Sequence, residues 1–497
     1  MKTVTKLKRY DMYINGEWTS PTDGEYFPSH NPATGEAWCE VAKGSAVDVD
    51  NAVQAAHAAF LSPEWRKMTP TQRGHLVSKL GELIAENVET LAKFETLDNG
   101  KLIREMRGQL QYLPEFYHYY GGLANKIQGN VLPIDKPDML VYSVREPLGV
   151  IAAITPWNSP LYLTTLKLAP ALITGNTIVI KPSEMTSASI LEFVKLVEKA
   201  GFPAGVVNVV TGFGMPVGDA LTSHPLVRRI AFTGGEVSAR KVVENSAKNF
   251  ASLSLELGGK SPNIVFEDAN LDNAAMGIIA GIFSASGQSC VAGSRAFIHK
   301  NVYDKVMEKL VHRVEQIKIG DPLQEETEMG PLATEAQLQR VEQYVDWGLK
   351  EGGKLICGGK RPENIENGWY FEPTIFEHAD NTSKITREEI FGPILSVIPF
   401  EDEDEVIQLA NSTEYGLATG IWTQDIGRAH RVSAEIRAGI VWINTYRSVS
   451  PIVPIGGSGL TGYGRESGME VVHEYTQTKS VWVNTSDKII EDPFKWV

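Results

Sequence analysis

One cysteine of the chain stands in a segment that is unusual for a buried thiol. Cys290 lies in "ASGQSCVAGSR", from Ala285 to Arg295, among glycines and small polar residues. A structural thiol usually packs within an apolar strand or helix, whereas glycines such as Gly287 and Gly293 let the backbone approach another group closely. A thiolate is a strong nucleophile and later a good leaving group. The segment therefore raises the hypothesis that Cys290 attacks a substrate.

Two glycine-rich turns suggest a nucleotide. In "TGFGMPVG" (211–218) the glycines are spaced one residue too far apart for the dinucleotide fingerprint, and "FTGGE" (232–236) ends a later strand. Both turns would lie at the carboxyl ends of strands, where open parallel sheets bind ligands. "KPSE" adds Lys181 and Glu184, an amine and a carboxylate that suit the hydroxyls of a ribose. For this tetrapeptide alone, an ion pair in a solvated loop is the favoured interpretation.

The elements that would position these residues follow an alternating pattern. Apolar strands are expected over 149–155, 176–183, 206–212 and 228–235, with helices over 163–174 and 187–201 between them. This alternation predicts a parallel sheet covered on both faces. Amphipathic helices are expected earlier, over 46–61 and 72–98, and a second α/β block follows 260 with helices near 302–319 and 333–351. Two isolated β-segments, 126–147 and 475–485, have no strand partner nearby in the sequence.

Composition limits the class of protein. A chain of 497 residues is expected to form two to four domains. The net charge of -14 argues against a nucleic-acid partner and against a basic membrane-binding patch. No apolar run is long enough to span a membrane, and the first residues lack the apolar core of a secretory signal, so we expect no membrane partner. The cysteines, Cys39, Cys290 and Cys357, are odd in number and far apart, which favours the reducing cytoplasm.

Seven motifs occur in an order and spacing that identify a family. They are "TPWNSP", "KPSE", "FTGG", "LELGGKSPNIVF", "GQSC", "EEIFGP" and "GRESG". The chain, from "YINGEW" to "TKSVWVN", resembles the NAD(P)-dependent aldehyde dehydrogenase superfamily. The resemblance implies an α/β fold with two Rossmann-like parallel-sheet domains and a small β oligomerisation domain. The implied ranges are 1–125 with 148–258 for the NAD-binding domain, 259–474 for the catalytic domain, and 126–147 with 475–497 for the oligomerisation strands.

The resemblance also implies a reaction, in which Cys290 forms a thiohemiacetal with an aldehyde and then a thioester. Asn158 and the backbone N–H of Cys290 would stabilise the oxyanion. Glu256 would activate the water that hydrolyses the thioester, and its partial burial should raise its pKa toward neutrality. Lys167 and Glu466 match positions that relay protons to this base, although both could be simple ion-pair partners.

The resemblance implies NAD as the cofactor. Lys181 and Glu184 would hold the adenine ribose, and Glu389 and Phe391 the nicotinamide ribose and ring. The full set implied for the cofactor is Thr155, Pro156, Trp157, Lys181, Ser183, Glu184, Gly214, Gly218, Phe232, Thr233, Gly234, Gly235, Leu257, Glu389 and Phe391. NADP is less favoured, because the Glu184 carboxylate would repel a 2′-phosphate. Gly235 replaces a serine that contacts the pyrophosphate in many members, so we expect modestly weaker binding or a shifted cofactor, with backbone N–H groups still available.

The residues implied for the substrate pocket depart further from common members. They are Ser159, Tyr162, Leu166, Arg447 and Ile455. Enzymes for small aliphatic aldehydes commonly carry aromatic residues at the positions of Ser159, Leu166 and Ile455. A wider and more polar pocket favours a bulky or functionalised aldehyde or cyclic hemiacetal, with a lean toward bacterial catabolic semialdehyde or hydroxylactone-type dehydrogenases. Arg447 could pair with a substrate carboxylate or be a solvated surface arginine, and no metal site is expected.

Two other functions fit the same fold. A coenzyme A-acylating semialdehyde dehydrogenase would pass the acyl group to coenzyme A, but that branch lacks the glutamate found here at Glu256. A non-catalytic binding protein would not need Cys290, Glu256 and Asn158 together. For assembly, the apolar strands in 126–147 and 475–497 resemble the family's oligomerisation strands, and they predict a homodimer or homotetramer because an exposed strand edge invites aggregation.

Overall fold

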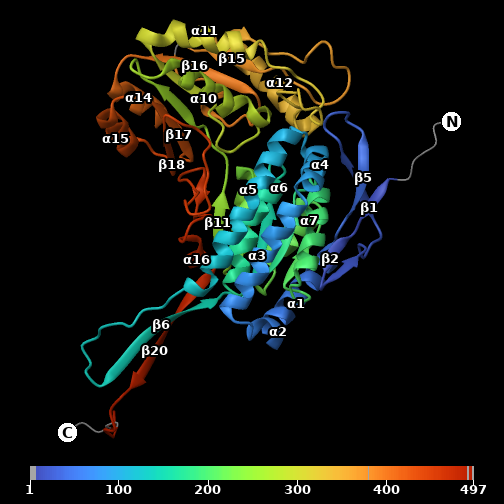
Figure 1. Cartoon of the computed structure of the whole chain (residues 1–497), viewed down its shortest axis with the longest axis vertical. Helices are drawn as coiled ribbons and strands as arrows, with labels where there is room; N and C mark the ends of the chain where they lie inside the picture. The colour runs from blue at the N-terminus through green and yellow to red at the C-terminus, as the bar shows by residue number, and fades with distance from the viewer. Residues whose placement is uncertain (1–6, 379, 490–491, 495–497) are drawn as a thin grey trace, which may run out of the picture.

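The computed structural model describes residues 7–378, 380–489 and 492–494. It consists of two α/β lobes and a projecting two-stranded ribbon (Figure 1). The ends of two expected ranges, residues 1–6 of the NAD-binding domain and 490–491 and 495–497 of the oligomerisation segment, lie outside the described residues. Among the described helices, none is long and apolar enough to cross a membrane.

The first lobe is built on an eight-stranded sheet with the order β19-β11-β10-β7-β8-β9-β2-β3. The strands are β19 (Gly462–Tyr463), β11 (Ser252–Glu256), β10 (Val227–Thr233), β7 (Val150–Thr155), β8 (Thr177–Pro182), β9 (Val207–Val209), β2 (Met12–Ile14) and β3 (Glu17–Thr19). Strands β11 to β9 are parallel, as the alternating sequence pattern predicted. A separate three-stranded sheet contains β1 (Lys8–Tyr10), β5 (Ala37–Ala42) and β4 (Tyr26–His30).

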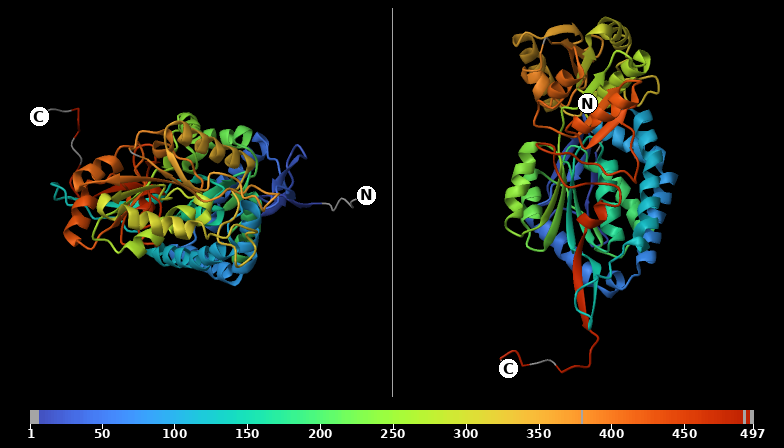
Figure 2. Two further views of the ribbon diagram at one scale, coloured as in Figure 1. Left: turned by 90° about the horizontal axis from the view of Figure 1, so that it is seen from above. Right: turned by 90° about the vertical axis from the view of Figure 1, so that its left-hand side faces the viewer.

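Helices cover both faces of this sheet (Figure 2, right). One face carries α1 (Ala46–Leu61), α8 (Asp219–Ser223) and α9 (Glu236–Ser246), and α2 (Pro63–Arg66) follows α1. The other carries α3 (Pro70–Glu86), α4 (Val88–Asn99), α5 (Ile103–Leu123), α6 (Pro160–Ile173) and α7 (Ser187–Ala200). Because side chains alternate along a strand, Ile151 and Ala153 pack under the second group of helices, while Val150 and Ala152 pack under the first.

Two sequence expectations for this lobe need correction. The helix expected over 72–98 is two helices that meet at Asn87, whose side-chain amide donates to the Leu83 carbonyl at 2.8 Å. Asparagine competes in this way with the helical backbone bonds and favours helix ends. The range 259–474 was expected to belong wholly to the catalytic domain, but β19 pairs antiparallel with β11 in the first sheet. The chain therefore returns from the second lobe to the first before the C-terminal strand.

The second lobe contains a seven-stranded sheet with the order β14-β15-β16-β13-β12-β17-β18. Its strands are β14 (Lys354–Cys357), β15 (Thr374–Glu377), β16 (Ile394–Phe400), β13 (Arg295–His299), β12 (Pro262–Val265), β17 (Ala418–Trp422) and β18 (Ile440–Ile443). One face carries α10 (Leu271–Phe283) and α11 (Tyr303–Val314); the other carries α12 (Glu335–Lys350), α13 (Lys384–Arg387), α14 (Glu403–Ala410) and α15 (Ile426–Glu435). All pairs are parallel except β14–β15, so the expected α/β fold is confirmed.

The two isolated β-segments pair with each other. β6 (Met139–Pro147) and β20 (Thr476–Asn484) form an antiparallel ribbon that runs from Thr476 opposite Pro147 to Asn484 opposite Met139. The short helix α16 (Val471–Glu474) precedes β20. Figure 1 shows the ribbon extending away from the first lobe. The two segments, which have no strand partner nearby in the sequence, thus pair with each other within the same chain.

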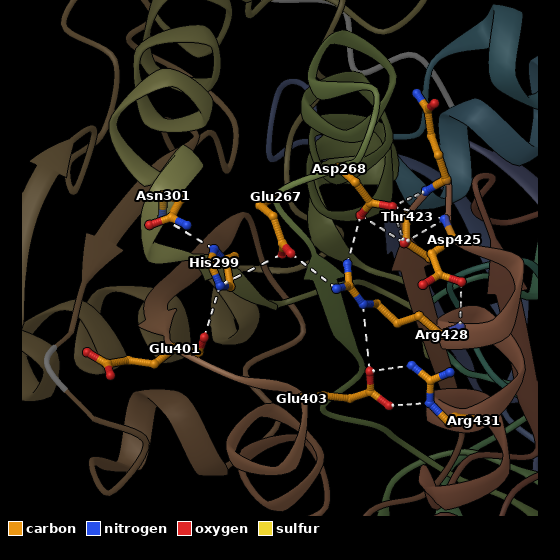
Figure 3. Close-up of polar contacts among 11 residues, drawn as sticks. Glu267, Asp268, His299, Asn301, Glu401, Glu403, Thr423, Asp425, Arg428 and Arg431 are labelled. Carbon is orange, nitrogen blue, oxygen red and sulfur yellow. Dashed lines mark hydrogen bonds and ion pairs between the residues drawn. The ribbon is translucent and has the colours of Figure 1, made fainter.

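The carboxyl edge of the second sheet is closed by a network of charged side chains (Figure 3). Arg428 of α15 lies 3.0 Å from Asp268 and 3.1 Å from Glu267, both just after β12, and 3.6 Å from Glu403 of α14. Asp268 also accepts hydrogen bonds from the Thr423 hydroxyl and from the backbone N–H groups of residues 424 and 425. The network ties both helices to the loops at this edge of the sheet.

This network predicts unequal effects for two neighbouring arginines. Arg428→Gln should lower the free energy of unfolding by about 1–3 kcal/mol, because it leaves partly buried carboxylates without their cation. Arg431→Gln is the matched control: Arg431 is 60% exposed and pairs only with Glu403 among the described residues, so its loss should change stability little. Urea unfolding of both variants followed by circular dichroism measures the difference. Equal midpoints for the two variants would contradict the structural role given to Arg428.

Candidate active site

Four neighbouring strands of the first sheet bring the sequence motifs to one edge. Lys181 on β8 lies opposite Ile154 on β7, which lies opposite Phe232 on β10, and Thr233 lies opposite Glu256 on β11. The chain leaves β7 for β8 on one side and later places β10 on the other side. Such a reversal in strand order opens a crevice at the carboxyl ends, where α/β sheets bind ligands.

The second lobe contributes segments that precede its strands. Gly258, Cys290, Glu389 and Tyr415 come before β12, β13, β16 and β17, respectively. They line, with the strand ends of the first lobe, a cavity of about 520 Å³. The residues expected from the sequence that line it are Pro156, Trp157, Asn158, Thr233, Gly234, Gly235, Glu256, Leu257, Cys290, Glu389 and Phe391.

The loop before Cys290 is conformationally constrained. Ala285 and Ser286 both have φ of 54°, and Gly287 follows with φ of 74°. Left-handed conformations are unfavourable for residues other than glycine and persist only where the surroundings impose them. Here the Ser286 hydroxyl donates to the Gly330 carbonyl at 2.8 Å, and a Cβ at Gly287 would lie 2.1 Å from the Gly392 carbonyl oxygen. The contacts fix the backbone that presents the thiol.

The Cys290 thiol lies in an acidic environment. Burial raises its pKa to about 11, and the nearby carboxylates of Glu389 and Glu256 add to the rise. The thiol is therefore protonated at neutral pH in the structure as it stands. Among the described residues, Cys39, Cys290 and Cys357 are free, and Cys39 packs in the core of the first lobe.

Asn158 is held against the nucleophile loop. Its side chain is 6% exposed, and its amide Nδ2 donates to the Gln288 carbonyl at 3.1 Å. Gln288 is fixed in turn, because its Oε1 accepts from the Ala333 N–H at 2.9 Å. An amide carries two donor hydrogens, so one remains for another acceptor near Cys290.

Glu256 ends β11 and faces a buried charge pair. Lys167 of α6 lies within hydrogen-bond distance of Glu466 and donates to the Thr233 hydroxyl at 2.7 Å. Burial and the Glu466 carboxylate raise the pKa of Glu256 well above its ordinary value, with Lys167 opposing the rise. Glu256 Oε1 has no hydrogen-bond partner among the described residues. A buried carboxyl with a raised pKa and a free oxygen is suited to act as a general base near neutral pH.

The Glu389 loop is fastened by helix α12. Arg340 donates to the carbonyl of Glu389 at 2.6 Å, and Gln337 donates to that of Phe391 at 2.7 Å. The Glu389 carboxylate accepts from the Gly259 N–H at 3.1 Å, and burial raises its pKa to about 7. The Phe391 ring packs edge-on against Trp157, with centroids 5.2 Å apart.

A second group of expected cofactor residues lies beyond the cavity. Lys181 is 4% exposed, its Nζ lies 3.6 Å from the Glu184 carboxylate, and Gly218 faces its side chain. Burial lowers the pKa of Lys181, and Glu184 opposes this effect. The remaining members are Thr155, whose hydroxyl has no partner among the described residues, Ser183, Gly214 and the buried Phe232.

The amino end of α9 faces the cavity. Gly235 is its N-cap, and a Cβ placed there would meet no atom within 4 Å. The next residues, Glu236, Val237 and Ser238, also line the cavity. Open space beside unpaired N–H groups at a helix start can accept an anion such as a phosphate.

The residues expected for the substrate pocket fall into two groups. Ser159 accepts a hydrogen bond from the buried Lys101 at 2.7 Å, and Arg447 donates to the Ala280 carbonyl at 3.2 Å. Leu166 is instead fully buried in the hydrophobic core of the first lobe, and the partly buried Tyr162 and Ile455 pack against that core. None of these five residues lines the 520 Å³ cavity.

Sequence reasoning missed several cavity residues. They are Leu163, Glu236, Val237, Ser238, Gly258, Gln337, Arg340, Tyr344, Glu388 and Tyr415. Gln337, Arg340 and Tyr344 are spaced by three and four residues and so share one face of α12. That spacing is visible in the sequence, but nothing local indicates which loop the face contacts. Among the described residues, no group of three or more His, Cys, Asp or Glu side chains forms a candidate metal site.

Comparison with known proteins identifies the family. The profile described as "Aldehyde dehydrogenase family" matches residues 18–481. A (Z)-2-((N-methylformamido)methylene)-5-hydroxybutyrolactone dehydrogenase of Acinetobacter baylyi is 49% identical over 98% of this chain and 99% of that protein. The NAD+ complex of an aldehyde dehydrogenase from Bacillus cereus has a TM-score of 0.94, is 44% identical, and covers 96% of this chain and 97% of its own. PnpE from Pseudomonas sp. WBC-3, in complex with nicotinamide adenine dinucleotide, has a TM-score of 0.95 at 44% identity, covering 98% of this chain and 100% of its own. With a profile match along most of its length and relatives this similar, the chain belongs to the aldehyde dehydrogenase family.

Proposed function

We propose that the protein oxidises a functionalised aldehyde to the carboxylic acid with NAD. The observation that carries the proposal is the meeting of Cys290, Asn158 and Glu256 in one cavity, with the Lys167–Glu466 pair behind Glu256. These are a nucleophile, an oxyanion donor and a base, which together suffice for acyl chemistry on sulfur. The names of the relatives, which include oxidation of a hydroxybutyrolactone, agree with this reaction class.

Each residue of the site has its own role in the proposed reaction. Cys290 loses its thiol proton to water, and the thiolate sulfur attacks the carbonyl carbon. The oxyanion of the resulting thiohemiacetal accepts hydrogen bonds from Asn158 and from the Cys290 backbone N–H. NAD held at Glu389 and Phe391 would supply the acceptor for the hydride that the thiohemiacetal carbon loses, and Cys290 would then carry a thioester. Glu256 then takes a proton from a water molecule, which attacks the thioester and releases the acid. The Glu466 carboxylate is proposed to accept this proton from Glu256, and the Lys167 ammonium to stabilise the Glu256 carboxylate.

The chain's own groups fit NAD at both ends. The open N-terminus of α9 suits the pyrophosphate, and Lys181 with Glu184 suits the adenine ribose. Glu389 and Phe391 suit the nicotinamide ribose and ring, because the Glu389 carboxylate accepts from Gly259 with one oxygen and keeps lone pairs for hydroxyls. The Glu184 carboxylate supports a preference for NAD over NADP.

The substrate is proposed to carry a polar group besides its aldehyde. Ser159, bonded to the buried Lys101 ammonium, adjoins Asn158 where an aromatic side chain would make the pocket apolar. Arg447 adds a second cation near both Cys290 and Lys101. These cations support a semialdehyde or a hydroxylactone that opens to one. The absorbance of NADH with a panel of such aldehydes, compared with simple aliphatic ones, tests this class.

Transfer to coenzyme A is the competing reaction. Glu256 argues against it, because a base that promotes hydrolysis would convert the thioester to the acid before coenzyme A accepted the acyl group. Adding coenzyme A to the same assay separates the two reactions: acceleration of NADH formation would favour acylation. The free cysteines support a reducing compartment, and we propose the cytoplasm.

Assembly as a homodimer or homotetramer is also proposed. The ribbon exposes apolar side chains, including Leu140, Trp482 and Val483 at 44%, 58% and 39%. Strand β18 is an edge of the second sheet, paired only with β17 within the described chain. A ribbon from another subunit that joined this edge would cover both surfaces.

Replacing Cys290 with alanine should abolish aldehyde oxidation, by at least about 10³-fold, because no other group can form the thioester. NAD affinity, measured by isothermal titration, should stay within about twofold of the parent, since the thiol is a small part of the contacts. Cys357→Ala is the control and should retain activity. Substantial oxidation by the Cys290 variant would refute the mechanism.

Glu256→Gln should preserve acylation and stall hydrolysis, giving at most one NADH per site in a stopped-flow burst. In the parent, the steady-state rate should rise with pH as Glu256 ionises, because only the carboxylate accepts a proton. The raised pKa moves this rise above the ordinary range for glutamate, and the rise should vanish in the variant. Loss of the burst itself would instead place Glu256 at activation of the thiol.

Trp482→Asp should dissociate the assembly by placing a charge on the ribbon. Ile426→Asp, at a site that is 70% exposed on α15, is the control and should leave the mass unchanged. Size-exclusion chromatography with light scattering compares these masses with multiples of the 54.6 kDa chain. A monomeric mass for the parent would show that the ribbon has no role in assembly.

A further inference from the structure

The cavity is strongly acidic for a site that takes an anionic cofactor. Among its lining residues, four are glutamates: Glu236, Glu256, Glu388 and Glu389. Arg340 is the one lysine or arginine among them. Its guanidinium is already committed, since it donates to the Glu389 carbonyl at 2.6 Å and to the Ile390 carbonyl at 3.3 Å. A pyrophosphate entering the cavity therefore finds a single cation among the groups that line it, and two of the nitrogens of that guanidinium already donate to backbone carbonyls.

One cation of α9 is paired with an acid at the start of the helix. Arg240 donates to one oxygen of Glu236, through Nη2 at 2.5 Å and Nε at 3.1 Å. The two residues are four apart on one helix, and side chains on a helix lean toward its N-terminus. The Arg240 guanidinium is thus held at Glu236, a residue that lines the cavity and directly follows Gly235.

This pair can exchange partners at small cost. The side chains of Arg240 and Glu236 are 68% and 35% exposed, so water screens their attraction and the pair contributes little to stability. The pyrophosphate of NAD carries two negative charges on neighbouring phosphates, whereas Glu236 carries one, and it can accept from a guanidinium through two oxygens, whereas Arg240 contacts only one oxygen of Glu236. The Glu236 carboxylate, in contrast, gains no partner from an anionic ligand and repels it.

We propose that Arg240 is a phosphate-binding residue that Glu236 holds in place until the pyrophosphate of the cofactor displaces it. This rests on the proposed use of NAD. Arg240 then supplies the contact that a serine hydroxyl at position 235 would make, and Gly235 leaves the space for it. Glu236 has two opposed effects: it keeps the guanidinium near the helix start, and it weakens binding by competing for the same guanidinium.

The test measures binding of NAD by isothermal titration, without substrate. Arg240→Gln should raise the Kd for NAD by about three- to tenfold, as expected for loss of one charge-assisted contact. Lys241→Gln removes the same charge from the neighbouring position, where the lysine pairs with Glu244, and should leave the Kd unchanged. Binding of adenosine, which has no phosphate, should be the same in all variants. An Arg240 variant indistinguishable from the Lys241 variant would overturn the proposal.

A double-mutant cycle tests the role of Glu236. Glu236→Gln should tighten NAD binding in the parent, and this gain should shrink at least about threefold in the Arg240→Gln background. An equal gain in both backgrounds would mean that Glu236 acts by repulsion alone and would refute the exchange of partners. If the folded parent binds no NAD, the cofactor assignment itself fails, and the proposal for Arg240 fails with it. If the parent binds NAD and the variants match it, only the proposal for Arg240 fails.

Discussion

The buried ion pair between Lys167 and Glu466 is the interaction on which the arrangement of the site depends. Lys167 comes from a helix of the first lobe, and Glu466 from the loop by which the chain returns from the second lobe. Both side chains are almost fully buried, so neither can lose its partner without leaving an uncompensated charge, which typically costs about 3–5 kcal/mol. The pair therefore fixes the returning loop against the first sheet.

This fixed loop determines where Glu256 lies. Glu256 stands opposite Thr233 on one side and Gly462 on the other, and Thr233 also accepts from Lys167. A Cβ at Gly456, in the same returning loop, would lie 2.8 Å from Glu256 Oε1. The carboxyl is enclosed by a strand, a loop and a charge pair, and this enclosure is what raises its pKa. The same contacts thus fix the position of the Glu256 carboxyl and raise its pKa.

The two sheets use opposite edges for the site, and this explains much of what the sequence could and could not predict. In the first sheet the motifs follow strands, so "KPSE" and "FTGG" could be placed at one edge from the alternating pattern alone. In the second sheet Cys290 and Glu389 precede strands, an arrangement that no general rule predicts; the resemblance supplied it. The carboxyl edge of that sheet holds the network around Arg428 instead (Figure 3).

Other features depended on tertiary contacts that a single sequence does not reveal. Three of them join residues far apart in the chain: the contact of α12 with the Glu389 loop, the Lys101–Ser159 hydrogen bond, and the pairing of β6 with β20. Leu166 was expected to face substrate. Every position of α6 after its first turn is buried, so the side chains there pack in the core whatever the hydrophobic periodicity of the helix indicates. The break at Asn87 was readable in principle, because asparagine favours helix ends, but the apolar spacing continues through it.

The acidity of the cavity has a consequence for the resting nucleophile. With a pKa of about 11, the Cys290 thiol is ionised on the order of once in 10⁴ molecules at pH 7. Oxidation of cysteine follows the thiolate fraction, so the same carboxylates that disfavour the nucleophilic form also protect the sulfur while the site is idle. A positive charge that enters beside Cys290 lowers the pKa of the thiol, because it stabilises the thiolate and opposes the effect of Glu256 and Glu389. Burial of Cys290, with Glu389 and Glu256 beside it, thus keeps the thiol protonated at neutral pH and makes its activation depend on what is bound.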